Sequence, residues 1–163
     1  MWGLELGLEY SATLKQIMWS AFSREGNTSL FSSRWVPRYL DTDPPVAAVG
    51  WMEREAAEAG LDVEVESEVV EMITADDKTI AEPSKTMIKI IAERSTKQIR
   101  GCVAIGNQAS EVINLAALAI QSGIGTREIE RLMLIHPSGS VAFQRCARGF
   151  KRDEPIEGVA SEQ

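Results

Sequence analysis

The side chain best suited to acid–base chemistry in this sequence is its single histidine, His136. Imidazole changes charge near neutral pH, so it can both accept and donate a proton. A histidine in that role is normally oriented by a carboxylate. No acid occurs among the residues that follow, 137–142. The spacing alone therefore favours a loop or helix-capping histidine over a catalytic one.

Two cysteines, Cys102 and Cys146, are the other side chains that could react. They stand far apart in the sequence, and their spacing matches neither a metal site nor a redox pair. Cys102 falls in a predicted strand and Cys146 in a predicted helix. We expect both thiols to be reduced and buried, as is typical of cytosolic proteins.

Other groupings of polar or aromatic residues favour structural roles. Glu53, Glu55 and Glu58 are expected to form a solvated acidic face of a helix, so we predict no metal site. Residues 101–106 lack both the glycine pattern and the Lys-Ser/Thr pair of a phosphate-binding loop. The tryptophans favour core or interface anchors over a platform for stacked bases. They are Trp2, Trp19, Trp35 and Trp51.

The composition limits the classes of partner. A net charge of −7 over 163 residues and a pI near 4.8 argue against a nucleic-acid surface. The longest apolar stretches, 87–92 and 115–120, are too short to cross a membrane. Glu5 and Glu9 interrupt the apolar residues at the start of the chain, so we expect no signal peptide. These features predict a cytoplasmic protein with neither a nucleic-acid nor a membrane partner.

The first half of the chain contains patterns for two helices and three strands. Residues 3–23 have mostly helical spacing of apolar positions, and residues 53–59 predict a short helix closed by Gly60. Strands are predicted at 35–40 and 46–49, joined by the rigid corner Asp43-Pro44-Pro45. Residues 62–70 alternate apolar and acidic side chains, which is typical of a half-buried strand.

The second half predicts a hairpin followed by helices. After a polar turn at 73–84, strands at 87–92 and 99–105 are joined by residues 94–97. A helix is expected at 109–121 with Gly123 as its stop, then one with Thr126 as N-cap running to about Met133. A last helix covers 140–148, and a loose tail follows at 151–163. This order predicts an α+β fold with helices packed on one face of an antiparallel sheet.

Several short stretches, in a fixed order, carry a more specific pattern. They are Val36-Pro37, the Thr-Asp-Pro-Pro run of 42–50, the acidic segment 53–56, Ile99-Arg100-Gly101-Cys102, Ala109-Ser110-Glu111 and Ile135-His136-Pro137-Ser138. Together they resemble the C-terminal dimerisation domain of the pyridine nucleotide-disulfide oxidoreductases. That family includes dihydrolipoamide dehydrogenase, glutathione reductase and mercuric reductase. The resemblance covers residues 36–148.

The resemblance implies a division of the chain and a partner. Residues 1–34 would be a helix and linker left from the flavin domain, 35–150 the dimerisation domain and 151–163 a tail. The domain would form a homodimer. The family binds FAD and NAD(P) through glycine-rich motifs and uses a Cys-x4-Cys pair, none of which this sequence contains. We therefore expect no cofactor and no reductase activity in the isolated chain.

For His136 the resemblance implies a specific place and role. In the family the His-Pro loop enters the partner's active site, its peptide bond is cis, and the histidine serves as acid–base for a dithiol near FAD. A glutamate five residues later orients it, but Val141 stands at that position here. Pro137, like His136, would then lie near a partner's FAD. Gly139 would allow an unusual backbone angle after this turn, and Ser140 would cap the helix that follows.

Three functional hypotheses follow. The chain is a self-associating domain without catalysis, or a subunit of a split flavoenzyme that lends His136 to a separate FAD- and NAD-binding chain, or a binding module that reuses the fold. The sequence leaves the parent substrate open among lipoamide, glutathione, mercuric ion and coenzyme A disulfide.

Overall fold

The computed structural model describes residues 33–72 and 84–150. The expected helix at 3–23, most of the turn at 73–84 and the tail at 151–163 lie outside these residues. The elements, in chain order, are η1 (Ser33–Trp35), β1 (Arg38–Leu40), β2 (Val46–Gly50), α2 (Glu53–Glu58), β3 (Val63–Met72), β4 (Ser84–Glu93), β5 (Ile99–Ile105), α3 (Ala109–Gln121), α4 (Thr126–Glu130) and α5 (Gly139–Arg148).

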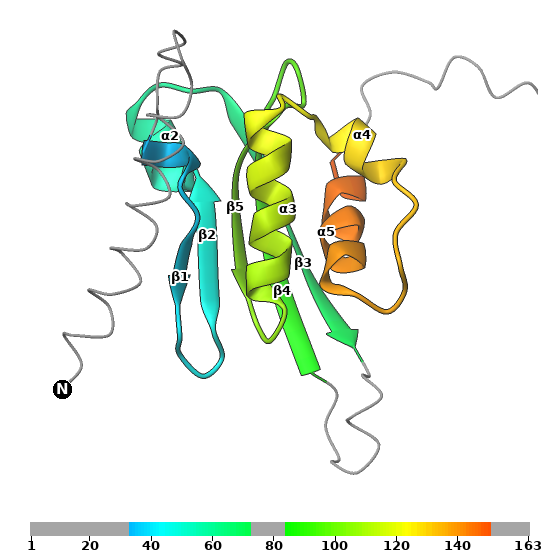
Figure 1. Ribbon diagram of the computed structural model, residues 1–163. Helices are drawn as coiled ribbons and strands as arrows, with labels where there is room; N and C mark the ends of the chain where they lie inside the picture. Colours follow the sequence, from blue (N-terminus) through cyan, green and yellow to red (C-terminus); the bar gives the residue numbers. More distant parts are fainter. Residues whose placement is uncertain (1–32, 73–83, 151–163) are drawn as a thin grey trace, which may run out of the picture. The chain divides into compact units, whose positions relative to one another are not determined.

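The strands form one antiparallel sheet in the order β1-β2-β5-β4-β3 (Figure 1). The hairpin predicted from residues 94–97 joins β4 to β5. Pairing of β2 with β5 brings distant parts of the chain together and places Gly50 opposite Gly101. The corner at Asp43-Pro44, whose peptide bond is cis, connects β1 to β2.

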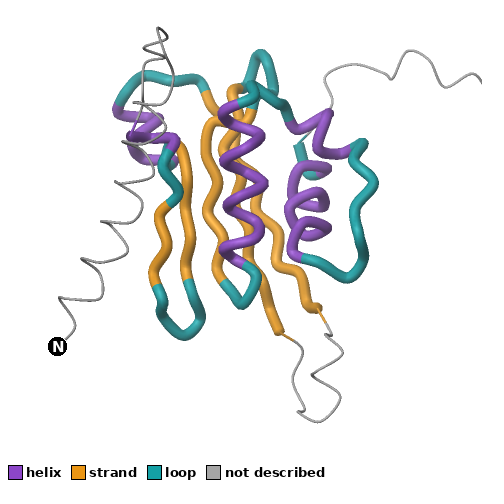
Figure 2. Tube along the Cα trace, in the orientation of Figure 1, coloured by secondary structure: helices purple, strands orange, loops and turns teal. Residues whose placement is uncertain are grey.

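The two longest helices cover one face of this sheet (Figure 2). Helix α3 lies over β5 and β2, and α5 lies beside it over β3 and β4. The predicted α+β class, with an antiparallel sheet and its long helices on one face, is therefore confirmed. In the described residues, no helix is both long and apolar enough to cross a bilayer.

The core lies between this helical layer and the sheet. Alternate residues of β4 and β5 point into it, as the pleat requires. Full burial of one such aliphatic or aromatic side chain stabilises the fold by about 1.5–3 kcal/mol. Its largest fully buried members include Ile88, Ile90, Ile113, Val112 and Phe143.

The opposite face of the sheet, which we call the open face, carries Val65, Val69, Lys89, Ile91 and Val103. Their strand registers place them together, because residues directly opposite in a ladder point to the same side. Helix α2 lies against one part of this face. Elsewhere the open face is more accessible, and Val69 is 60% exposed.

Strand β3 lies at the edge of the sheet and turns glutamates toward the helical layer. Glu64 pairs with Lys97, its Oε1 lying 2.7 Å from Nζ, and the contact is an ion pair rather than a directional hydrogen bond. Glu68 accepts a hydrogen bond from Arg145 of α5 at 2.8 Å. These pairs tie the edge strand to the β4–β5 turn and to α5.

The strand predicted at 35–40 is wrong in its first half. Trp35 belongs to the 3-10 turn η1, and β1 begins only at Arg38. Pro37 has no N–H to donate to a ladder, so the strand starts after it. The neighbouring Arg34 guanidinium lies 3.5 Å from the centre of the Trp51 ring.

The predicted start of α4 is also wrong by one residue. Its N-cap is Gly125, whose N–H donates to Glu128 Oε2 at 3.0 Å, while Thr126 is buried inside the helix. The backbone N–H of Thr126 donates to the carbonyl of Lys97, which fixes the chain beside β5. The helix ends at Glu130 rather than near Met133 because its last turn tightens: Leu132 N–H donates to the carbonyl of Ile129.

The start of α5 needs a similar correction. Its N-cap is Ser138, and Ser140, which the sequence suggested as a cap, lies in the first turn. Gly139 has no left-handed backbone angle. Its lack of a side chain instead permits close packing, since a Cβ there would lie 2.8 Å from Gln108 Oε1 and 3.0 Å from Val112 Cγ2.

Candidate functional site

His136 lies in the loop between α4 and α5, and its side chain is exposed. The peptide bond to Pro137 is cis, as the resemblance implied. Next to it, the Ser138 hydroxyl donates to the carbonyl of Ile135 at 2.6 Å. The imidazole is thus presented on a loop whose backbone is held just before the histidine.

Val141 is half-buried in the first turn of α5 and offers no hydrogen-bond acceptor in its side chain. Among the described residues, the His136 imidazole has no hydrogen-bond or ion-pair partner. The site therefore contains an accessible histidine without the carboxylate that an acid–base dyad requires.

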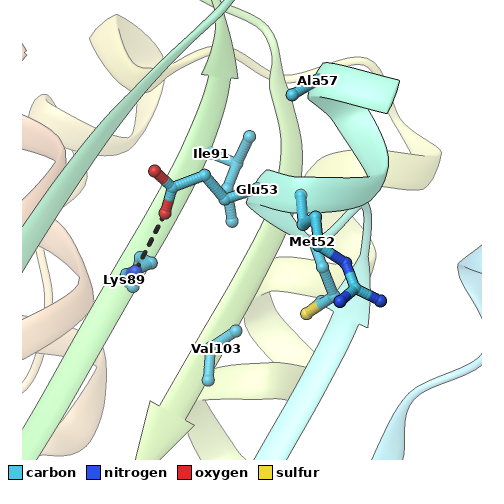
Figure 3. A pocket seen from close by; sticks show the side chains of 7 residues that line it. Met52, Glu53, Ala57, Lys89, Ile91 and Val103 are labelled. Carbon is cyan, nitrogen blue, oxygen red and sulfur yellow. Dashed lines mark hydrogen bonds and ion pairs between the residues drawn. The ribbon is translucent and has the colours of Figure 1, made fainter. Parts of the chain in front are cut away.

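A pocket of about 520 Å³ lies between α2 and the open face of the sheet (Figure 3). Ile91, Val103 and Ala57 give it an apolar lining. At its edge, Lys89 Nζ lies 3.1 Å from Glu53 Oε2, so the two charges neutralise each other. The pocket offers hydrophobic contact but no arrangement of groups that would perform a reaction.

The sequence did not reveal this pocket. Its walls come from α2 and from the β4–β5 hairpin, which is distant from α2 in the chain. Apolar alternation in the strands indicates which residues share a face, but it does not indicate where a short helix crosses that face.

The glutamates of α2 have separate partners rather than a shared ligand. Glu53 pairs with Lys89, Glu55 Oε2 accepts from the N–H of Met52 at 3.2 Å, and Glu58 pairs with Arg54 at 3.4 Å. Within the described ranges there is no group of three His, Cys, Asp or Glu side chains that could hold a metal ion.

Both cysteines are free and buried in the core, as predicted. Burial raises the pKa of the Cys102 thiol well above its ordinary value, and the nearby Cys146 adds to the shift. Burial also raises the pKa of Cys146 to about 12. Its sulfur lies 3.4 Å from the carbonyl oxygen of Glu66. Neither thiol is activated as a nucleophile.

We predict that native protein resists thiol alkylation at pH 8. With the pKa of Cys146 near 12, only about one thiol in ten thousand is ionised at that pH. In the unfolded chain the pKa returns to about 8.5, so labelling is fast. Mass spectrometry after iodoacetamide treatment should show labelling at least about 100-fold slower in buffer than in denaturant. Equal rates would contradict the burial of the two thiols.

Residues 36–147 match the family described as "Pyridine nucleotide-disulphide oxidoreductase, dimerisation domain". The chain belongs to this family. The match begins at the Val-Pro pair before β1 and ends within α5, so it includes the whole sheet and the His136 loop. The expected resemblance to the dimerisation domain of the pyridine nucleotide-disulfide oxidoreductases is confirmed over this range.

Mammalian relatives are similar over the same region. The chain is 36% identical over 109 residues to the mitochondrial dihydrolipoyl dehydrogenase of Sus scrofa, which covers 67% of this chain and 21% of that protein. It is 32% identical over 121 residues to that of Cricetulus griseus, with 74% and 23% covered. The chain thus spans less than a quarter of the length of these relatives.

Solved structures share the fold. LpdA from Mycobacterium tuberculosis aligns with a TM-score of 0.64 at 25% identity, over 82% of this chain and 28% of that one. The HOCl-induced flavoprotein disulfide reductase RclA from Escherichia coli aligns with a TM-score of 0.65 at 22% identity, over 83% and 31%. The latter likeness concerns the fold alone.

Gly101 in β5 and Gly106 in the loop after it are the glycines to consider for a phosphate-binding loop, and both are closely packed. A Cβ at Gly101 would lie 1.9 Å from the carbonyl oxygen of Trp51, and one at Gly106 would lie 2.5 Å from that of Lys85. At both glycines the space that a side chain would occupy is filled by the protein's own backbone. Gly101 and Gly106 thus do not form a phosphate-binding loop for FAD or NAD(P).

Proposed function

We propose that residues 36–147 hold two copies of this chain together as a homodimer and are not catalytic by themselves. The observation that carries this proposal is the outer face of α3. Leu118 is 59% exposed there, whereas the other apolar residues of the helix are buried or half-buried. Because the chain belongs to a dimerisation-domain family, we take Leu118 as part of the surface that a partner subunit covers.

The loop before His136 supports the same function. Met133 is fully exposed, and Ile135 is 84% exposed. Burial of such exposed apolar side chains in an interface lowers the free energy of the complex. The interface would be isologous, so each subunit would contribute the same residues to it.

The test is the mass of the purified chain in solution. Light scattering at micromolar concentration should give twice the 17.9 kDa of one chain. A two-fold interface of the usual kind would bury more than about 1,000 Å². A well-behaved monomer at a concentration of about 100 μM would contradict the proposed function.

An alternative function is favoured by the exposed and unpaired imidazole. In this alternative, the chain contributes His136 to the active site of a separate flavin-binding chain, which supplies FAD, NAD(P) and the redox thiols. An accessible histidine without a competing hydrogen bond is available for proton transfer. Its parent activity would be NAD(P)H-dependent reduction of a disulfide or oxidation of dihydrolipoamide.

This alternative predicts a gain of function at Val141. In a complex reconstituted with such a flavoprotein, Val141→Glu should provide the missing orienting carboxylate and raise the rate of dithiol oxidation about tenfold. His136→Ala should lower the rate by a similar factor. Steady-state assays with dihydrolipoamide and NAD would measure both. If neither variant changes the rate, His136 is not the acid–base group.

We also propose that the protein works in the cytoplasm. Two free, buried cysteines suit a compartment in which thiols stay reduced. Cell fractionation with an antibody against the chain would test this location.

A further inference from the structure

The segment between α4 and α5 is held at both ends by side chains of α5 and its N-cap. At its end near His136, the Ser138 hydroxyl donates to the carbonyl of Ile135. At its start, the amide of Gln144 donates to carbonyls at the end of α4. Between these two anchors, residues 133–137 project Met133, Ile135 and His136 outward.

The contacts of Gln144 are unusually many for one amide group. Its Nε2 lies 3.3 Å from the carbonyl oxygen of Ile129, 3.1 Å from that of Glu130 and 2.6 Å from that of Leu132. An amide has two N–H hydrogens, so one of them is shared. Gln144 is only 7% exposed, and solvent therefore has little access to replace these bonds.

Ile129 and Glu130 belong to the last turn of α4, where carbonyls lack the usual partner four residues later in the helix, and Leu132 lies just beyond the helix. By gathering these carbonyls, Gln144 fixes the point at which α4 stops and the direction in which the chain leaves it. We infer that Gln144 is the positioning residue that presents the His136 segment to its partner subunit. This inference rests on the proposed self-association.

The role depends on hydrogen-bond donation, which distinguishes it from mere filling of space. Gln144→Met keeps an unbranched side chain of similar length but donates nothing. Gln144→Glu keeps the shape and turns an acceptor toward three carbonyl oxygens, which is worse than donating nothing. Arg145→Gln is the matched control. Arg145 lies beside Gln144 on α5, and its substitution breaks a surface hydrogen bond to Glu68 of β3 without changing any contact of the segment.

The first measurement is amide hydrogen exchange by NMR on the full chain. The reporters are the N–H groups of Arg131 and Leu132, which donate to Glu128 and Ile129 in the last turn of α4. We expect their exchange to accelerate about tenfold in Gln144→Met and further in Gln144→Glu, with no change in Arg145→Gln. Core amides of β4 should keep their rates.

The second measurement is the dimer dissociation constant by sedimentation. It should rise about tenfold in Gln144→Met and further in Gln144→Glu, with the control unchanged. Parental exchange rates in Gln144→Met, or equal acceleration of the segment and β4, would overturn the positioning role. A parent chain that is monomeric would overturn the self-association instead, and the exchange rates would then decide the role of Gln144 in ordering the segment.

Discussion

Leu118→Asp should convert the proposed dimer to a monomer. A carboxylate in an interface must lose its water without gaining a partner, at a cost of about 2 kcal/mol or more for each subunit. A two-fold interface contains the residue twice, so the dissociation constant should rise nearly a thousandfold. Because Leu118 is 59% exposed in the single chain, the fold itself should tolerate the change. Sedimentation equilibrium would measure the constant.

Val69→Asp is the matched control. Val69 is 60% exposed, so it resembles Leu118 in exposure, but it belongs to β3 on the open face of the sheet. Its variant should dimerise like the parent. If Val69→Asp dissociates the dimer and Leu118→Asp does not, the partner covers the open face instead of α3.

Gly101→Ala should destabilise the fold severely. The methyl group would lie 1.9 Å from the carbonyl oxygen of Trp51, a distance at which the backbone must move. Gly50, opposite in the ladder, is equally confined: its φ is +77°, and a Cβ would lie 2.2 Å from the carbonyl oxygen of Arg100. We expect the free energy of unfolding to fall by about 4 kcal/mol or more, measured by urea denaturation.

Gly60→Ala provides the comparison for this prediction. Gly60 also has a positive φ, +71°, but a Cβ there would meet no atom within 4 Å. Only the backbone preference is then lost, at a cost of about 1 kcal/mol. Similar losses of unfolding free energy in the two variants would mean that the pairing of β2 with β5 is less closely packed than the structure describes.

The helix α3 shows what local sequence could predict. Its apolar positions recur strongly enough to place it at Ala109–Gln121, and Gly123, with a φ of +66°, ends it as expected. The N-caps of α4 and α5 lie one and two residues before the positions that the sequence predicts. Hydroxyl residues near a helix start are good caps, but the contact of Thr126 with Lys97 decides where the backbone turns.

The site was predictable only where it repeats a motif. His136 and Pro137 could be identified from their sequence neighbours, and so could the absence of a carboxylate at Val141. Gln144 could not, because a glutamine on a helix is ordinarily a solvated residue. Its three carbonyl partners belong to another element and meet it only after α4 and α5 have packed together.

The glutamates on β3 have a consequence for how the molecule avoids unwanted assembly. An edge strand offers unpaired backbone groups, to which another sheet can add by hydrogen bonding. Here the exposed edge is flanked by Glu64, Glu66 and Glu68, of which the first and last are held in place by Lys97 and Arg145. A second β3 laid alongside would have to accommodate this row of charged side chains and their cationic partners. The row thus disfavours edge-to-edge pairing of sheets through β3.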